Sequence, residues 1–447
     1  MRVLLVILLF FIFGGNSAFA YDLVLPKEKK SIVNSNYAFF VGKANKSEII
    51  SINDEKVYIA PNGAFAHSIK LKDGENRILV KSNFSTQVYK FYKDKTEKFV
   101  EPELIDLVPR IYLVKKDNTP LRSTPVDYGM NRISHLFEDT CLIINGQKGD
   151  FYRVLLSKNK EAWIAKSAVI ASNKDIKPEF VSMDSDSYKN ASKHKIQFTE
   201  KLPYTIEETD NEIFFRVYNP IVSENSIYTM NIKKPRKYKY ETISFEGEYI
   251  FKVKELPISN NNLLEGLIIT IDAGHGGNEK GAIGCLGDME KDINLKIANE
   301  LYEILSQNGA NVIMTRECDG FISLEDRIKI AQKNGTDIFI SIHLNSIPDI
   351  KMDIHKNKGT SVYYYNSNSK ELAKYIEENV SDSINTRKDG VKSASFAVIR
   401  STEYVGVLVE IAYMTNPIDS VIYTKEDFPS KAAKGIADGI MNFVQAE

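Results

Sequence analysis

Several residues that can bind metals or move protons stand at the ends of apolar segments in the C-terminal part of this 447-residue chain. His275 follows an apolar run and a glycine-rich turn, and His343 and Glu410 each end a further apolar run. Glu290 stands at the start of a helical pattern. Imidazole and carboxylate groups are ligands suited to zinc, so these residues predict a metal or acid/base site if the fold brings them together.

The elements that must position these residues are three buried strands and a helix. The runs 267–271, 337–343 and 405–410 are apolar and rich in β-branched residues, which is typical of buried parallel strands. A helical repeat then runs from Glu290 through Ile293, Ile297, Leu301 and Leu305. Open α/β sheets bind ligands at the carboxyl ends of their strands, so we expect the polar residues to meet at that edge.

Residues 267–443 resemble the catalytic domain of the zinc-dependent N-acetylmuramoyl-L-alanine amidases, the family called amidase type 3. Matching motifs are Asp-Ala-Gly-His-Gly-Gly at 272–277, residues 290–295, Thr315-Arg316, 341–345, Gly390-Val-Lys and 409–416. Ala412, Tyr413 and Thr415 stand where the family usually has Gly, Phe and Ser. We expect these departures to change packing beside Glu410 more than the chemistry.

The resemblance implies one Zn²⁺ per catalytic domain, with His275, Glu290 and His343 as ligands and Glu410 as the catalytic residue. Three protein ligands leave a position open, and zinc lowers the pKa of its water to roughly 7. Glu410 would then act as general base and acid. Asp272 and Asn345 are candidates to orient ligands, although Asp272 could equally cap the glycine turn.

The implied reaction is hydrolysis of the amide between N-acetylmuramic acid and the L-alanine of peptidoglycan stem peptides. One ordinary helix separates Tyr365 from Gly390, so we expect no segment of the chain itself to plug the site. Two alternatives stay open: a metallo-carboxypeptidase acting on wall peptides and a catalytically silent peptidoglycan-binding protein. The first would need an arginine for a free carboxylate, and only Arg327 and Arg400 come into consideration.

Residues 1–20 predict a secretory signal, with a positive start, an apolar core and an Ala-Phe-Ala cleavage motif. We therefore expect an exported protein of the periplasm, cell envelope or extracellular space, without stable membrane insertion after cleavage. The formal net charge of −1 gives no reason to expect nucleic-acid binding. Peptidoglycan is the expected partner, and the protein is expected to be a monomer. Three cysteines are too few for a disulfide scaffold, and Cys285 is expected to be a small buried residue.

The fold class predicted is a multidomain chain with all-β modules in its N-terminal half and a C-terminal α/β domain. Alternating strands and turn signals predict an immunoglobulin-like β-sandwich at 21–100, and a linker at 93–109. Residues 110–172 resemble a bacterial SH3-like barrel, with Trp163 expected in its core rather than at a substrate. A connector at 173–193 and a small β unit of unknown role at 195–257 follow.

The catalytic domain is predicted at 262–447, with a mostly parallel twisted sheet flanked by helices. His355 lies in a lysine-rich loop and is a poor candidate for a fourth metal ligand. The periodicity predicts helices at 291–308, 323–334, 369–381 and 430–445, and strands at 311–315, 337–343, 359–365 and 405–410.

Overall fold

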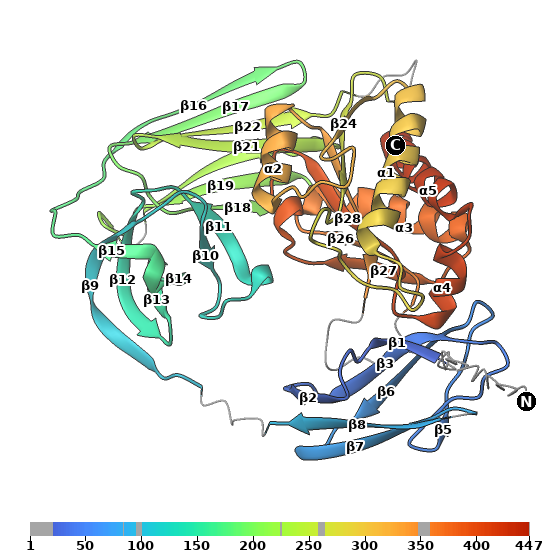
Figure 1. Ribbon diagram of the computed structural model, residues 1–447. Helices are drawn as coiled ribbons and strands as arrows, with labels where there is room; N and C mark the ends of the chain where they lie inside the picture. Colours follow the sequence, from blue (N-terminus) through green and yellow to red (C-terminus); the bar gives the residue numbers. More distant parts are fainter. Residues whose placement is uncertain are drawn as a thin grey trace, which may run out of the picture.

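The computed structural model describes residues 21–83, 85–94, 101–223, 226–257, 264–346 and 358–446. An N-terminal half built of strands is followed by a C-terminal domain in which helices and strands alternate (Figure 1). The predicted signal at 1–20 and His355 lie outside the described residues. Within those residues no helix combines the length and the apolar character that crossing a membrane requires.

The first domain consists of two small sheets. One has the strand order β1-β3-β6 and the other the order β2-β8-β7-β4-β5. Phe40, Phe65 and Val80 are fully buried in the core they share. The strands are β1 (Tyr21–Leu25), β2 (Lys30–Val33), β3 (Tyr37–Ala44), β4 (Ser51–Ile52), β5 (Glu55–Lys56), β6 (Ala64–Lys70), β7 (Gly74–Lys81) and β8 (Thr86–Lys93).

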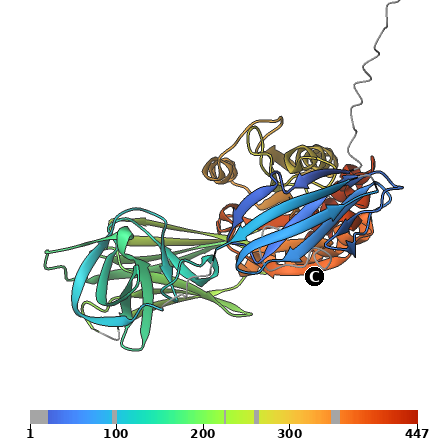
Figure 2. The same cartoon turned by 60° about the horizontal axis from the view of Figure 1, so that its bottom comes forward.

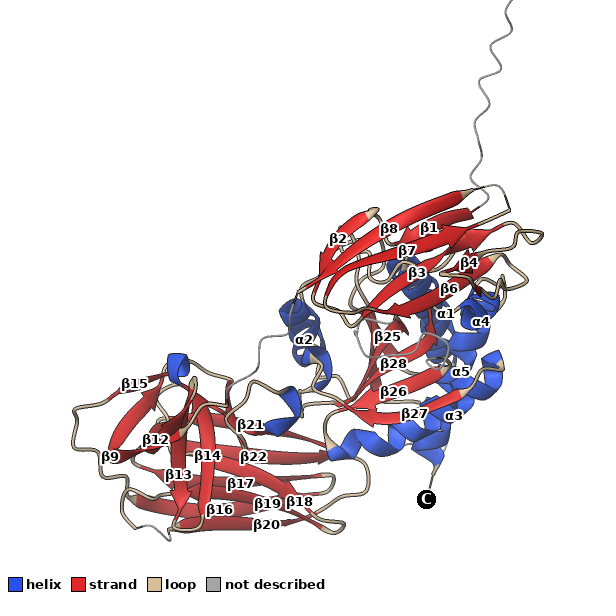
Figure 3. Cartoon of the chain, turned by 90° about the horizontal axis from the view of Figure 1, so that it is seen from below, coloured by secondary structure: helices blue, strands red, loops and turns tan. Residues whose placement is uncertain are grey.

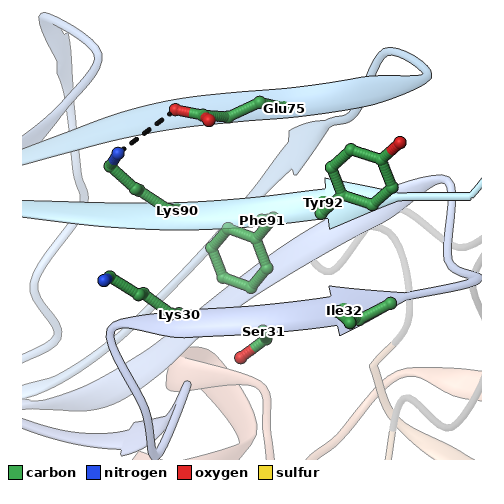
Figure 4. A pocket seen from close by; sticks show the side chains of 7 residues that line it. All are labelled: Lys30, Ser31, Ile32, Glu75, Lys90, Phe91 and Tyr92. Carbon is green, nitrogen blue, oxygen red and sulfur yellow. Dashed lines mark ion pairs between the residues drawn. The ribbon is translucent and has the colours of Figure 1, made fainter.

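A shallow pocket lies at the edge of this domain where β2 pairs with β8 (Figure 4). Its charged side chains include Lys90 and Glu75, which form an ion pair at 3.3 Å. It contains none of the residues singled out above as catalytic or metal-binding candidates. Its lining residues are Lys30, Ser31, Ile32, Glu75, Lys90, Phe91 and Tyr92.

The second β unit is a seven-stranded sheet in the order β11-β10-β14-β13-β12-β9-β15. Its first strand begins at Leu104, so the predicted linker at 93–109 is too long. The strands are β9 (Leu104–Val114), β10 (Thr119–Arg122), β11 (Arg132–Leu136), β12 (Cys141–Lys148), β13 (Phe151–Ser157), β14 (Lys160–Ala165) and β15 (Val169–Ala171).

The third unit has two sheets, with the orders β16-β17-β22-β21 and β18-β19-β20. The expected connector at 173–193 is wrong, because β16 occupies much of it and pairs along its length with β17. The second and third units also share one hydrophobic core, which joins Leu142 and Ile164 to Phe215 and Tyr249. The strands are β16 (Phe180–Tyr188), β17 (Ala191–Phe198), β18 (Tyr204–Glu208), β19 (Glu212–Tyr218), β20 (Ile227–Lys233), β21 (Tyr238–Phe245) and β22 (Glu248–Glu255).

The C-terminal domain is built on a six-stranded sheet in the order β24-β23-β25-β28-β26-β27. All neighbouring pairs are parallel except β26 and β28. The strands are β23 (Ile268–Ala273), β24 (Asn311–Met314), β25 (Ile338–Asn345), β26 (Thr360–Tyr364), β27 (Lys388–Ser393) and β28 (Val405–Tyr413).

Helices cover both faces of this sheet. The helices are α1 (Glu290–Gln307), α2 (Leu324–Lys333), α3 (Lys370–Ile384), α4 (Pro417–Tyr423) and α5 (Phe428–Gln445). Apolar residues of α1, α3 and α5 form the main core with one sheet face, and α2 packs with Phe339 and Leu408 on the other. Glycines let α3 and α5 approach closely: a Cβ at Gly439 would lie 2.7 Å from Ile376 Cα.

The first domain packs against the C-terminal domain near β6 and α4, as Figures 2 and 3 show. Cys285 is fully buried there, in a cluster with Val41 and Ala64, which confirms the expectation of a small buried residue. Asn62 Nδ2 donates to Ser420 Oγ at 3.1 Å across the same contact. Cys285 belongs to the loop that leads to Glu290, so this contact braces the loop from outside.

Candidate metal centre and catalytic carboxylate

His275 is presented by a sharp turn at the carboxyl end of β23. The residue has a φ of +61°, in the left-handed region. Gly274 permits the turn to pass next to the second histidine: a Cβ at this position would lie 2.3 Å from His343 Cε1. The glycine-rich sequence is therefore required for the two imidazole rings to approach each other.

A buried ion pair fixes the backbone of this turn. Asp272 Oδ1 accepts hydrogen bonds from Arg327 Nη1 at 2.5 Å and Thr315 Oγ1 at 2.7 Å, and Oδ2 accepts from Ser341 Oγ at 2.8 Å. The Asp272 and Arg327 side chains are 2% and 3% exposed. Arg327 also donates to the carbonyl oxygen of His275 at 2.7 Å. Asp272 thus holds the backbone of the turn through Arg327.

A second arginine ties the same turn to α1. Arg316 donates to the carbonyl oxygens of Ala273 at 2.8 Å, Gly274 at 3.0 Å and Lys291 at 2.8 Å. Carbonyls at the ends of a strand and a tight turn need such donors, because their neighbours cannot pair with them. The two guanidinium groups therefore anchor the backbone on both sides of His275.

Glu290, the first residue of α1, lies between the two histidines. Its Oε2 is 3.1 Å from His275 Nε2, and its Oε1 is 2.8 Å from His343 Nδ1. The backbone N–H groups of Ala282 and Leu344 also donate to this carboxylate, at 2.8 Å and 3.2 Å. Burial raises the pKa of Glu290, but the hydrogen bonds from the two histidines outweigh it and hold the pKa well below its usual range.

The ligand atoms of His275, Glu290 and His343 all lie within 4.8 Å of one another. Burial lowers the pKa of His343, but its hydrogen bond to Glu290 outweighs this effect and raises the pKa to about 8. A largely buried carboxylate flanked by two imidazole nitrogens is a place that stabilises positive charge. Two nitrogens and one oxygen that converge in this way fit a catalytic zinc ion, which uses three protein ligands.

Glu410 lies beside this cluster and outside it. In the sheet it is opposite His343 of β25 on one side and Ser361 of β26 on the other. Among the described residues, none forms a hydrogen bond with its buried Oε2. Burial raises the pKa of Glu410 to about 7, although the nearby His343 partly opposes the rise. A carboxyl group with this pKa can both accept and return a proton near neutral pH.

Asn345 ends β25 opposite Tyr413, and its carbonyl oxygen accepts from the N–H of Met414 at 2.8 Å. It therefore joins the ends of β25 and β28 through its backbone. The proposed role of its side chain in orienting a ligand stays a prediction.

The profile of the N-acetylmuramoyl-L-alanine amidases matches residues 269–442. Protein YqiI of Bacillus subtilis is 38% identical over 184 residues, which cover 40% of this chain and 86% of that protein. The germination-specific N-acetylmuramoyl-L-alanine amidase of the same organism is 30% identical over 224 residues, 46% of this chain and 88% of that protein. Through its C-terminal domain, the chain belongs to the N-acetylmuramoyl-L-alanine amidase family.

Relatives of this amidase family differ in how much of their length is shared. The amidase LytC of B. subtilis is 37% identical over 186 residues, which are 41% of this chain and only 36% of LytC. Among solved structures, the catalytic domain of CwlV from Bacillus (Paenibacillus) polymyxa var. colistinus is 34% identical. The match covers 40% of this chain and 99% of that one, with a TM-score of 0.38.

Three residues that support the amidase site were missed or misread in the sequence. Arg316 was matched only as part of a motif, and its hydrogen bonds to three carbonyl oxygens were missed. Arg327 is occupied by Asp272 and the turn. Asn294 donates to the carbonyl oxygen of Gly274 at 3.2 Å and lies one helical turn after Glu290. That i, i+4 spacing was the available signal.

Proposed function

We propose that this protein is a zinc-dependent N-acetylmuramoyl-L-alanine amidase that acts on peptidoglycan. The observation that supports this most strongly is the convergence of His275, Glu290 and His343 beside Glu410, in a domain of this family. The three clustered residues would hold the metal. A zinc ion bound there would supply a Lewis acid for the amide carbonyl and make water more acidic.

Glu410 would carry the proton in this reaction. It would accept a proton from the attacking water and return it to the leaving amide nitrogen. Its pKa of about 7 is suited to both steps. The buried Oε2 has no hydrogen-bond partner among the described residues, so none of them competes for this oxygen.

The amide to be cleaved would be the one between N-acetylmuramic acid and the L-alanine of the stem peptide. Relatives named for this activity, and others named as probable cell wall amidases, support peptidoglycan as the substrate. The same relatives support an exported protein, for which residues 1–20 would supply the signal. The predicted Ig-like and SH3-like modules belong to the same proposal.

The contacts of Arg327 and the position of Arg400 argue against the carboxypeptidase. Arg327 is buried and bonded to Asp272 and the turn, so it cannot bind a substrate carboxylate. Arg400 precedes β28 whereas Glu410 lies late in that strand, so Arg400 is too far from Glu410 to bind the carboxylate of a residue next to the cleaved bond. In the β25–β28 register Glu410 is opposite His343, which supports a proton-transfer role beside the metal and argues against a silent binding protein.

Mass analysis of purified peptidoglycan digested by residues 21–447 would test the proposal. We expect free peptides that begin with L-alanine, together with peptide-free glycan. A chelator should abolish their release and zinc should restore it. Release of single amino acids would instead identify a carboxypeptidase, and binding to the wall without release would identify a binding protein.

A further inference from the structure

Three arginines gather at the seam between the second β unit and the C-terminal domain. Arg122 of β10 lies directly opposite Arg132 of β11, separated only by the strand spacing. Arg400 comes from the C-terminal domain, just after the turn 397–399. Like charges placed directly opposite one another in a sheet are destabilising, so this arrangement calls for an explanation.

Contacts across the seam hold the arginines near one another. A Cβ at Gly129 would lie 2.4 Å from Ser395 Cβ, so the loop before β11 touches the C-terminal domain closely. Arg122 Nη1 donates to the carbonyl oxygen of Tyr128, next to that glycine, at 2.8 Å. From the other side, Arg400 Nε donates to Ser395 Oγ at 2.8 Å.

Few negative charges balance this cluster. Arg122 pairs with Asp127, whose side chain is 79% exposed. In the described part of the chain no carboxylate pairs with Arg132 or Arg400, and the buried Nε of Arg132 has no hydrogen-bond partner. Burial first, and then the charges of all three arginines, lower the pKa of His135 to about 4. The seam therefore has a positive potential with unused donors.

This cluster lies on the sheet face that also carries Glu410. Ser361 of β26 is opposite Glu410, Tyr363 is opposite Leu408, and Tyr365 follows with the same alternation. The three guanidinium groups partly offset the rise that burial causes in the pKa of Tyr365, so its hydroxyl lies near them. From Ser361 to Tyr365 the strand advances four residues, or roughly 13 Å.

This sheet face has a catalytic carboxyl group at one end and a positive cluster at the other. In charge and length it is complementary to a short peptide that ends in a free carboxylate. Four extended residues span about 13 Å, the same length as the strand between the two ends. Guanidinium groups bind carboxylates through paired hydrogen bonds, and Arg132 has a donor to offer. Tyr363 lies between the two ends: its ring packs against Phe396 at 5.2 Å, and Lys392 lies 5.8 Å from its centre.

We propose that Arg132 and Arg400, together with Tyr365, bind the free carboxylate at the far end of the peptide whose first amide is cleaved beside Glu410. The inference rests on the proposed amidase function, because it assigns the other end of the same substrate. Arg122 contributes charge and is held by its bonds to Tyr128 and Asp127. The second β unit thereby selects peptides by their terminal carboxylate.

The test compares two synthetic N-acetylmuramoyl tetrapeptides that differ only in a terminal carboxylate or carboxamide. Their dissociation constants are measured by calorimetry with the zinc-loaded Glu410→Gln chain, residues 21–447, so that no turnover is needed. We expect the acid to bind about 10- to 100-fold more tightly, the range for hydrogen bonds to a charged group. Arg132→Gln and Arg400→Gln, each added singly, should remove most of that preference.

Arg110→Gln is the matched control, because Arg110 is an exposed arginine of β9 in the same unit. It should keep the preference for the acid. Equal binding of acid and amide, or no binding of either, would overturn the proposal, as would a preference that survives both seam variants. A preference for the acid without hydrolysis by the unsubstituted chain would refute the amidase and leave the carboxylate site standing. If a seam variant fails to fold, the ratio of the dissociation constants for acid and amide, measured with the Glu410→Gln chain alone, still tests the proposal.

Discussion

Replacement of Glu410 by glutamine is expected to abolish turnover and, at the same time, to stabilise the metal-free C-terminal domain at alkaline pH. Loss of proton transfer by a positioned carboxylate typically costs a factor of about 10² to 10⁴ in rate. Metal binding should persist, because Glu410 lies outside the cluster of His275, Glu290 and His343. The two effects have one cause, the burial of a carboxyl group without a hydrogen-bond partner for its Oε2.

The size and sign of the stability change follow from the pKa of Glu410. A pKa of about 7 in the folded protein, against an ordinary value of 4.5, corresponds to about 3 kcal/mol. Below pH 4.5 both the folded and the unfolded chain hold the proton, so there is no penalty. Between pH 4.5 and 7 only the unfolded chain releases it, and the folded state loses stability with rising pH. Glutamine removes this loss.

Hydrogen exchange of the β25 and β28 amides is the suitable assay, since Trp163, the chain's single tryptophan, reports on another domain. At pH 8 the amides of metal-free Glu410→Gln should exchange more slowly than those of the parent, and the difference should shrink towards pH 5. Peptide release and zinc content are measured on the same preparations. Loss of zinc from this variant would show that Glu410 is a metal ligand. Faster amide exchange than in the unsubstituted chain would show that the fold stabilises the Glu410 carboxylate. Retained turnover would show that Glu410 does not transfer the proton.

Three further outcomes are expected. The pKa of His343 is raised to about 8, and a metal ligand must be deprotonated. Zinc affinity, measured by competition with a chromophoric chelator, should therefore fall up to about tenfold per pH unit below pH 8 and level off above it. A flat affinity profile from pH 6 to 9 would contradict this. Asp272→Asn should lower the free energy of unfolding by about 3–5 kcal/mol, because it leaves Arg327 buried and unpaired. Adding Arg327→Leu should recover part of this loss, as measured by chemical denaturation followed through hydrogen exchange of β23. Strictly additive losses in the double variant would contradict the prediction. Gly274→Ala should weaken zinc binding, because the added methyl group crowds the His343 ring. Gly320→Ala is the control: no atom lies near its added methyl group, so it should bind zinc as the unsubstituted chain does. Equal zinc affinities of the two variants would contradict the prediction.

Helices with a continuous apolar stripe could be predicted closely from the sequence. The helix expected at 291–308 is α1 (Glu290–Gln307), and the one expected at 430–445 is α5 (Phe428–Gln445). In contrast, β16 was missed because nearly all its residues are exposed, and its pairing with β17 leaves no apolar alternation to read. The short α4 had a readable signal, since Asn416 caps it at 2.8 Å and Pro417 opens it.

For the site, the sequence identified the side chains that converge and not the groups that hold them. The motif around His275 and the strand ends at His343 and Glu410 carry strong chemical signals. The supporting roles of Arg316 and Arg327 carry no such signal, because both donate to carbonyl oxygens of a turn that exists only in the folded chain. Nor does any periodicity show that Arg122 and Arg132 face each other, since cross-strand pairing depends on a loop and a register shift.

Strand direction explains why one substrate could reach both the catalytic carboxyl and the arginine seam. Glu410 lies late in β28, at the carboxyl edge of the parallel strands β23 and β25. Because β26 runs antiparallel to β28, it begins beside Glu410 and carries its later residues towards the opposite edge, where Tyr365 follows. A fully parallel sheet would bring the end of β26 back to the metal centre. Because of this single antiparallel pair, β26 instead runs from the metal centre towards the second β unit. A chain that lacks the second β unit should therefore lose its selectivity for the terminal carboxylate before it loses amide hydrolysis.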